Sequence, residues 1–387
     1  MNKKNKVIIY VNFAPYENTG KILDFLFEKF DTVVSFRFNF HKLSGSSDNS
    51  RLTIYHKGKT IENRPLYYIP TPSSIAFIIL PIRSFIIFLQ ILFHLIYVNK
   101  RYGTPTTYFT VNAFTAWCGN VAKKLGLVKR TVFWVWDYYP PQHKDSMVRF
   151  MRWLYWQFDK PATLKSDTVI FLNRKLELLR KKFDLLPKEK KYRFVPIGTN
   201  PIATSKKKII GTVKLVYLGV LKKSQGLNVF FDAASSLKRK FTNISLDIIG
   251  SGPDEDYFKE RAKSCPIKIN FHGFLSDENK VDAIISKCDI GLAAYVHEKS
   301  NVSYYGDPSK IKRYLSRGLP VITTNVFEFS KEISLTKAGI IIEDLPKNFI
   351  HALETITKNY AKFSQNALNL AKKYNYRKIY PTLFADL

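Results

Sequence analysis

Cysteines and acidic side chains are scarce in this chain of 387 residues. Its three cysteines, Cys118, Cys265 and Cys288, are too few and too scattered for a disulfide framework or a zinc site, so we expect a reducing compartment. The chain also lacks low-complexity tracts, and 45% of its residues are hydrophobic, which is typical of a globular protein. The length predicts two or three domains, each with its own core.

The shortage of acidic residues leaves a large positive charge. The chain has 61 Lys and Arg residues and 31 Asp and Glu residues, which gives a formal net charge of +30. The excess is greater in residues 1–200, where 32 basic residues face 13 acidic ones. Such a field favours anionic membrane surfaces, nucleic acid or phosphorylated substrates, and does not choose among them.

A cleavable signal peptide and an uninterrupted membrane span are also missing. We interpret the short apolar run Val7–Val11 as a first buried strand. Residues 74–98 are overwhelmingly apolar, but Arg83, Gln90 and His94 form one narrow polar stripe on a helix. A charged residue deep in hydrocarbon is costly, so spanning is disfavoured. A mostly buried helix and a helix lying in a membrane interface both remain open.

Strands and helices alternate through the chain, which predicts an α/β fold with parallel sheets. Residues 199–208, with three consecutive lysines, suit a linker between two lobes. The expected front-half strands are 7–11, 32–38, 106–110, 131–136 and 168–172. The expected rear-half strands are 214–219, 245–250, 268–271, 289–295, 319–324 and 339–342.

The segment 305–324 reads as a loop, a short helix and a buried strand. Asp307 is a good N-cap, Pro308 suits the first helical position and Gly318 ends the helix. Free backbone amides at the start of this helix, together with Lys310, would lie at the carboxyl edge of the sheet. This is where α/β folds bind phosphates.

With these residues in view, the chain resembles glycosyltransferase family 4. The resemblance is carried by an ordered set of motifs: Tyr217-Leu218-Gly219, Ile248 to Pro253, Phe271 to Phe274, Cys288 to Leu292 and Pro308 to Val321. In the front half it depends on strand order and on Trp134 to Pro141.

The resemblance implies the GT-B fold, in which two Rossmann-like lobes face an interlobe cleft. Residues 1–200 would form the acceptor lobe and 201–365 the lobe that binds a nucleoside-diphosphate sugar. Residues 366–387 are expected to form a last helix, and one possibility is that this helix crosses back to the first lobe. The resemblance further implies transfer with retention and without a metal or other cofactor.

The local patterns and the resemblance together indicate candidate site residues. Asp137 and Lys310 are the catalytic candidates. The donor-binding candidates are Gly219, Lys222, Lys223, Gly250, Gly252, His272, Gly273, Asp307, Ser309, Lys310 and Ile311. The acceptor-binding candidates are Tyr16, Glu17, Thr19 and Tyr138.

The sequence departs from the family pattern at three places. Val220 and Gln225 stand where relatives carry a phosphate clamp, so Lys222 or Lys223 is expected to replace it. Tyr305 and Arg313 stand where relatives often carry two glutamates. In relatives the second glutamate usually binds the ribose of the nucleotide. Asp307 or Glu328 could take over this role here, and the sequence does not decide between them.

The sequence therefore predicts a glycosyltransferase acting on a saccharide acceptor that is lipid-linked, at the cytoplasmic face of the plasma membrane. A non-catalytic subunit of the same fold is the first alternative, because Tyr305 and Arg313 replace carboxylates. A nucleic-acid-binding protein is the second, although the basic residues are dispersed and no recognition motif is present.

Overall fold

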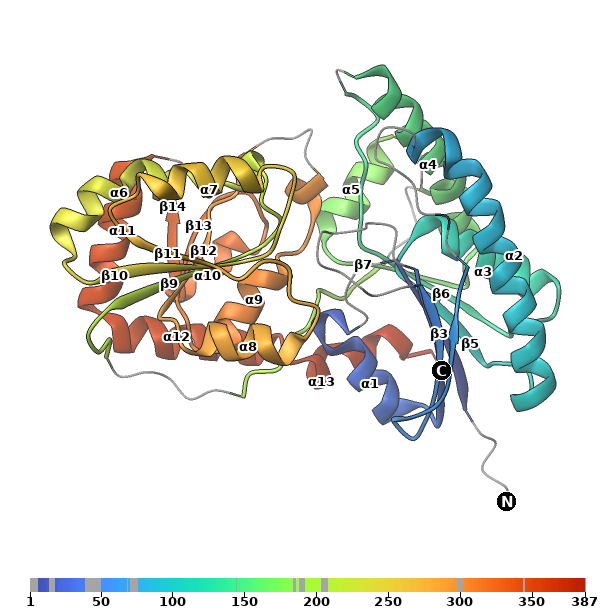
Figure 1. Cartoon of the computed structure of the whole chain (residues 1–387). Helices are drawn as coiled ribbons and strands as arrows, with labels where there is room; N and C mark the ends of the chain where they lie inside the picture. Colours follow the sequence, from blue (N-terminus) through green and yellow to red (C-terminus); the bar gives the residue numbers. More distant parts are fainter. Residues whose placement is uncertain are drawn as a thin grey trace.

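Two α/β lobes make up the structure, a computed structural model that describes residues 6–13, 18–38, 50–67, 69, 76–143, 145–183, 186–187, 192–202, 208–297, 302–343 and 345–386. Figure 1 shows the front lobe, in blue to green, beside the rear lobe, in yellow to red. Each lobe is built on its own sheet, as the alternation of strands and helices predicts.

The front lobe contains an eight-stranded sheet in the order β4-β3-β2-β1-β5-β6-β7-β8. All strands pair in parallel except the β2–β3 and β3–β4 pairs, which are antiparallel. The strands are β1 (Val7–Asn12), β2 (Thr32–Arg37), β3 (Arg51–His56), β4 (Lys59–Pro65), β5 (Thr107–Thr110), β6 (Thr131–Val135), β7 (Thr168–Phe171) and β8 (Arg193–Phe194). The helices are η1 (Thr19–Lys21), α1 (Ile22–Lys29), α2 (Ala76–Tyr102), α3 (Ala113–Lys124), α4 (Ser146–Lys165) and α5 (Arg174–Lys182).

The rear lobe contains a six-stranded, fully parallel sheet in the order β11-β10-β9-β12-β13-β14. Its strands are β9 (Val213–Leu218), β10 (Ile244–Ile249), β11 (Lys268–Phe271), β12 (Ile290–Ala293), β13 (Val321–Thr324) and β14 (Gly339–Ile342). Its helices are η2 (Lys223–Gln225), α6 (Asn228–Lys240), α7 (Glu255–Lys263), α8 (Glu278–Ser286), η3 (Val302–Tyr305), α9 (Ser309–Ser316), α10 (Ser330–Thr336), α11 (Pro346–Lys358) and α12 (Tyr360–Lys373).

The end of the chain returns to the front lobe as α13 (Tyr376–Ile379) and η4 (Tyr380–Phe384). Tyr380 and Phe384 are buried in the front core, where Tyr380 packs edge-on against Trp134. The Tyr380 hydroxyl accepts from Gly198 N at 2.8 Å and donates to Gly20 O at 2.7 Å. The tail thus completes the front core and holds the start of the linker against the loop after β1.

Helix α2 has one buried face and one exposed face. Ile87, Ile91, Leu95 and Val98 are buried against the front sheet at helical spacing. The expected polar stripe is not a solvent face, since Arg83 is buried and Gln90 exchanges two hydrogen bonds with the Tyr67 backbone. Residues 79–102 are long and apolar enough to cross a membrane by length and composition alone.

Candidate active site

A cavity of about 360 Å³ lies between the lobes. The front lobe lines it with residues 18–21 after β1, with Trp136 after β6 and with residues 197–200. The rear lobe lines it with the ends of β9 and β10, with Phe274, and with one face each of α8 and α9. Every parallel strand that reaches the cavity does so at its carboxyl end, the edge at which such folds bind ligands.

Helix α9 supplies Lys310 to this cavity. Ile311, Tyr314 and Leu315 are fully buried on the opposite side of the helix, and they anchor it to the sheet. This anchoring turns residues 309, 310, 313, 316 and 317 toward the cavity. Asp307 is not the expected N-cap, because Pro308 occupies that position without a side-chain cap.

Four basic side chains line the cavity, and Lys310 differs from the others because it has no carboxylate partner among the described residues. Burial lowers the pKa of Lys310 to about 8. The close approach to β9 explains part of this burial, since a Cβ at Gly219 would lie 3.0 Å from Lys310 Nζ. Gly250 (φ 134°) passes equally close, because a Cβ there would lie 1.9 Å from the Gly219 carbonyl oxygen. Both glycines allow this close approach because they have no side chain.

Helix α8 brings carboxylates that pair with the other cations. Asp282 accepts from Arg313 Nε at 2.7 Å and from Arg317 Nη2 at 2.6 Å. Although burial opposes the effect, these two guanidinium groups lower the pKa of Asp282. Glu278 lies 3.7 Å from Arg313 Nη1 and 4.0 Å from Lys21 Nζ, and burial raises its pKa. The four cations outnumber the two acids, so the cavity favours an anion.

Five of the residues predicted for the site line the cavity: Thr19, Gly219, Gly250, Ser309 and Lys310. Gly252 instead packs against the backbone of Leu221. Gly273 accepts from Gly250 N through its carbonyl oxygen, and Ile311 is in the core. Tyr16 and Glu17 lie outside the described residues.

Four predicted donor contacts are placed elsewhere. Lys222 and Lys223 are exposed, and the Lys223 ammonium lies over the Tyr257 ring at 4.1 Å. His272 bonds Asp247 on the far side of β10, at 2.7 Å. Asp307 accepts from Lys312 Nζ at 2.7 Å and from Ile197 N at 2.6 Å, so its carboxylate joins the two lobes.

Two predicted front-lobe residues also fall outside the cavity lining. Tyr138 is only 1% exposed and packs against the Tyr305 ring, so it has no surface for an acceptor. Asp137 follows Trp136 and is half-buried. Burial raises the pKa of Asp137 to about 6, against the opposing charge of Arg180. Arg180 also donates to the Asp137 carbonyl oxygen at 2.6 Å, which fixes this loop beside the cavity.

Several lining residues were not predicted from the sequence, namely Asn18, Lys21, Trp136, Phe274, Glu278, Asp282 and Arg317. Glu278 and Asp282 bring carboxylates into the cavity lining, where the sequence has none at positions 305 and 313. The proposed replacement Glu328 does not line the cavity. The four-residue spacing of Glu278 and Asp282 on one face of a helix is the signal that could have identified them.

The rear lobe is the part of the chain that matches a known protein family. Residues 201–374 match the family "Glycosyl transferases group 1". A GDP-mannose-dependent alpha-(1-6)-phosphatidylinositol dimannoside mannosyltransferase from Mycobacterium tuberculosis is 26% identical over 144 residues, 37% of this chain and 35% of the relative. The chain therefore matches about a third of the length of this curated relative.

Solved structures extend the likeness to both lobes. Sucrose-phosphate synthase from Thermosynechococcus elongatus superposes with a TM-score of 0.68 at 14% identity, covering 99% of this chain and 100% of that one. Anabaena HepE in complex with UDP gives a TM-score of 0.64 at 12% identity, covering 98% of each chain. At such identities the likeness shows the fold alone, which is GT-B.

Proposed function

Because residues 201–374 match the family "Glycosyl transferases group 1" and both lobes have the GT-B fold, we propose that the protein is a glycosyltransferase, which takes a sugar from a nucleoside-diphosphate sugar bound in the interlobe cavity. The observation that carries this proposal is the unpaired, half-buried ammonium of Lys310 at the start of α9. It stands near the start of α9, where a diphosphate would meet the positive charge of the ammonium and of the helix dipole. The cavity volume of about 360 Å³ falls in the range of small-molecule sites.

In the proposed reaction the bond between the sugar C1 and the diphosphate oxygen breaks while an acceptor oxygen bonds to C1. Negative charge grows on the departing diphosphate, and Lys310 stabilises it there. The amides of the first turn of α9 add to this effect. The acceptor proton leaves with the diphosphate. We propose that transfer proceeds with retention and needs no metal.

For the acceptor we propose a lipid-linked saccharide that is reached from the cytoplasmic face of the plasma membrane. The outer face of α2 supports this, because Ile82, Phe85, Leu89, Phe93 and Ile96 are 45–67% exposed. They recur at helical spacing and form one apolar stripe, which we call the α2 stripe. A continuous exposed apolar stripe of this kind often marks a surface that binds a membrane or a partner.

Helix α4 extends this apolar surface. Met147, Phe150 and Trp153 are 45–54% exposed near its start. Phe88 of α2 and Phe158 of α4 both contact Trp117 of α3, at 5.3 and 5.4 Å between ring centroids, so the helices lie on one side of the lobe (Figure 1). Apolar and aromatic side chains in a strongly basic chain favour an anionic bilayer. The mycobacterial relative is named for a lipid acceptor, in keeping with this proposal.

The donor site is tested with purified protein and a panel of UDP-, GDP- and ADP-sugars, with products read by mass spectrometry. We expect one donor to be consumed, and Lys310→Gln to lower turnover about 10²–10³-fold because the leaving group loses its counter-charge. Lys347→Gln, an exposed lysine of α11, is the matched control and should leave the rate unchanged.

Two other results would point elsewhere. Full turnover in a folded Lys310→Gln variant would remove the proposed role of Lys310. Failure of the whole panel would favour the non-catalytic subunit, which Tyr305 and Arg313 already suggest through their occupation of carboxylate positions. In that case both side chains are structural, as their contacts with Tyr138 and Asp282 allow.

A further inference from the structure

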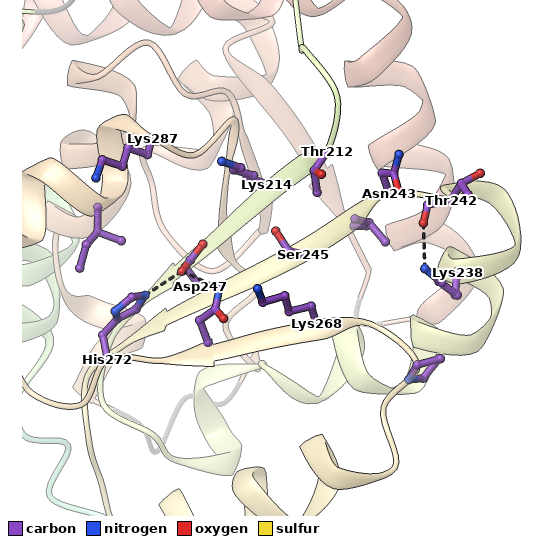
Figure 2. Close-up of a pocket in the computed structure, with 14 residues that line it drawn as sticks. Thr212, Lys214, Lys238, Thr242, Asn243, Ser245, Asp247, Lys268, His272 and Lys287 are labelled. Carbon is purple, nitrogen blue, oxygen red and sulfur yellow. Dashed lines mark hydrogen bonds and ion pairs between the residues drawn. The ribbon is translucent and has the colours of Figure 1, made fainter.

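The rear lobe has a second cavity, of about 620 Å³, that shares no lining residue with the interlobe cavity. It lies over β9, β10 and β11, at the edge of the six-stranded sheet. The last residues of α8 form another side of it. Figure 2 shows its polar side chains standing on neighbouring strands. We call it the sheet-edge groove.

Strand register places two lysines on either side of a serine in this groove. Ser245 pairs with Lys214 of β9 on one side and with Lys268 of β11 on the other. Residues in register on parallel strands point to the same face, and Figure 2 shows Ser245 between the two lysines. Ser245 is only 8% exposed, and its hydroxyl has no hydrogen-bond partner among the described residues. That hydroxyl is not one of the fully buried polar atoms that lack a partner, so it is open to the groove and can bond a ligand there.

The charges around Ser245 are predominantly positive and mostly uncommitted. Lys287, just after α8, adds a third ammonium to those of Lys214 and Lys268. No carboxylate of the described chain lies within ion-pair distance of these three. A fourth, Lys238, donates to the Thr242 carbonyl oxygen at 2.8 Å.

Asp247 is the acidic residue among those that line the groove, and its carboxylate is already engaged. It accepts from Asn270 Nδ2 at 3.2 Å and bonds His272 Nε2 at 2.7 Å (Figure 2). These bonds hold the carboxylate at the His272 end of the groove. The end around Ser245 is left to the lysines.

We propose that the sheet-edge groove binds a phosphoryl group through Lys214, Lys268 and Ser245, with Lys287 as a further cation. Adjacent strands are about 4.8 Å apart, so the two lysine stems start about 10 Å apart, and their ammonium groups can reach one anion between them. Three ammonium groups and a hydroxyl match the several oxygens of a phosphate better than the two of a carboxylate.

Two other occupants fit less well. A second copy of this chain would bring its own positive field, since the formal charge is +30. A single-stranded nucleic acid needs aromatic side chains on which its bases stack, and the residues that line the groove include none of Phe, Tyr or Trp. This phosphoryl site does not depend on the proposed transferase reaction.

The groove is tested by amine-reactive labelling of the full chain, read residue by residue with mass spectrometry. Inorganic pyrophosphate should slow the labelling of Lys214 and Lys268 about fivefold or more, and leave Lys347 unchanged. The measurement is made in the Lys310→Gln variant, so that protection cannot arise from the interlobe cavity. A parallel arm uses phosphatidic acid vesicles in place of pyrophosphate.

Calorimetry then assigns the binding to side chains. In the Lys310→Gln background, the added double substitution Lys214→Gln/Lys268→Gln should abolish pyrophosphate binding, while the added Lys259→Gln/Lys263→Gln on α7 should leave it unchanged. If vesicles protect these lysines and pyrophosphate does not, the site is supported, and the phosphoryl group that it binds belongs to a lipid headgroup. Absence of protection by both probes, or binding that survives Lys214→Gln/Lys268→Gln, would overturn the proposal.

Discussion

Two lysines of α9, two residues apart, have opposite roles. Lys312 is 1% exposed and donates to Asp307 and to the Ile197 carbonyl oxygen, so its charge is used between the lobes. Lys310 faces the cavity, without a carboxylate among the described residues. An unpaired ammonium in a poorly hydrated site costs folding free energy. Such a cost is typical of a residue retained for binding.

The proton of Lys310 gives donor binding a defined pH dependence. Its pKa is lowered to about 8 in the empty site by burial, and a bound diphosphate raises that pKa because it favours the charged form. Binding above pH 8 therefore takes up a proton. We expect donor affinity to be constant below about pH 7 and to fall up to about tenfold per pH unit above pH 8.

Calorimetry in buffers of different ionisation enthalpy measures this proton uptake directly. In Lys310→Arg the guanidinium stays charged throughout, so the uptake and the loss of affinity should both disappear. If Lys310→Arg keeps the wild-type pH profile, another group is responsible for it.

At the scale of elements, the rear lobe is the part that the sequence predicts best. Its six strands are apolar runs separated by helical spacing, and each lies within two residues of its expected bounds. The hairpin β3–β4 was not predicted. Its turn has positive φ at Lys57 (49°) and Gly58 (75°), and lysine is an unusual residue for such a turn, so the sequence signal was weak.

The α2 stripe leads to a prediction about membranes. Phe85 and Phe93 are 60% and 67% exposed, so replacing both by serine should leave the fold intact. Since burial of each phenyl ring in a bilayer contributes about 1.5–3 kcal/mol, we expect Phe85→Ser/Phe93→Ser to weaken binding to anionic vesicles at least about tenfold. Vesicle sedimentation gives the bound fraction.

Leu335→Ser is the control for this prediction, because Leu335 is 83% exposed on α10 of the other lobe. It should bind vesicles like the wild type. Equal binding by Phe85→Ser/Phe93→Ser would mean that the stripe serves another partner.

At the scale of the whole molecule, the candidate site could be predicted only in part. Lys310, Ser309, Gly219 and Gly250 follow strand ends and a helix start, which are local patterns. Glu278 and Asp282 come from another helix and meet Arg313 and Arg317 only after the sheet has formed. His272 was misplaced for a similar reason, since a one-residue change along a strand end moves a side chain to the other face.

The junction of the returning tail with the front lobe and the start of the linker includes the Tyr380 hydroxyl, which bonds Gly198 N and Gly20 O. Tyr380→Phe leaves both buried groups without this partner, a cost of about 1–3 kcal/mol. We expect the thermal midpoint to fall by about 3–8 °C, measured by calorimetry. Tyr67→Phe, at a 65% exposed position, should not change it. An unchanged midpoint in Tyr380→Phe would show that the junction is held by other contacts.

The returning tail has a consequence during synthesis. The front core includes Phe384, which is 2% exposed, stacks on the Phe25 ring and packs edge-on against Phe30 and Phe109. A ribosome therefore cannot release a finished first domain while it translates the second. Until the tail has been translated, the amino-terminal half lacks the last part of its core, and apolar surface stays exposed while the rear lobe is made.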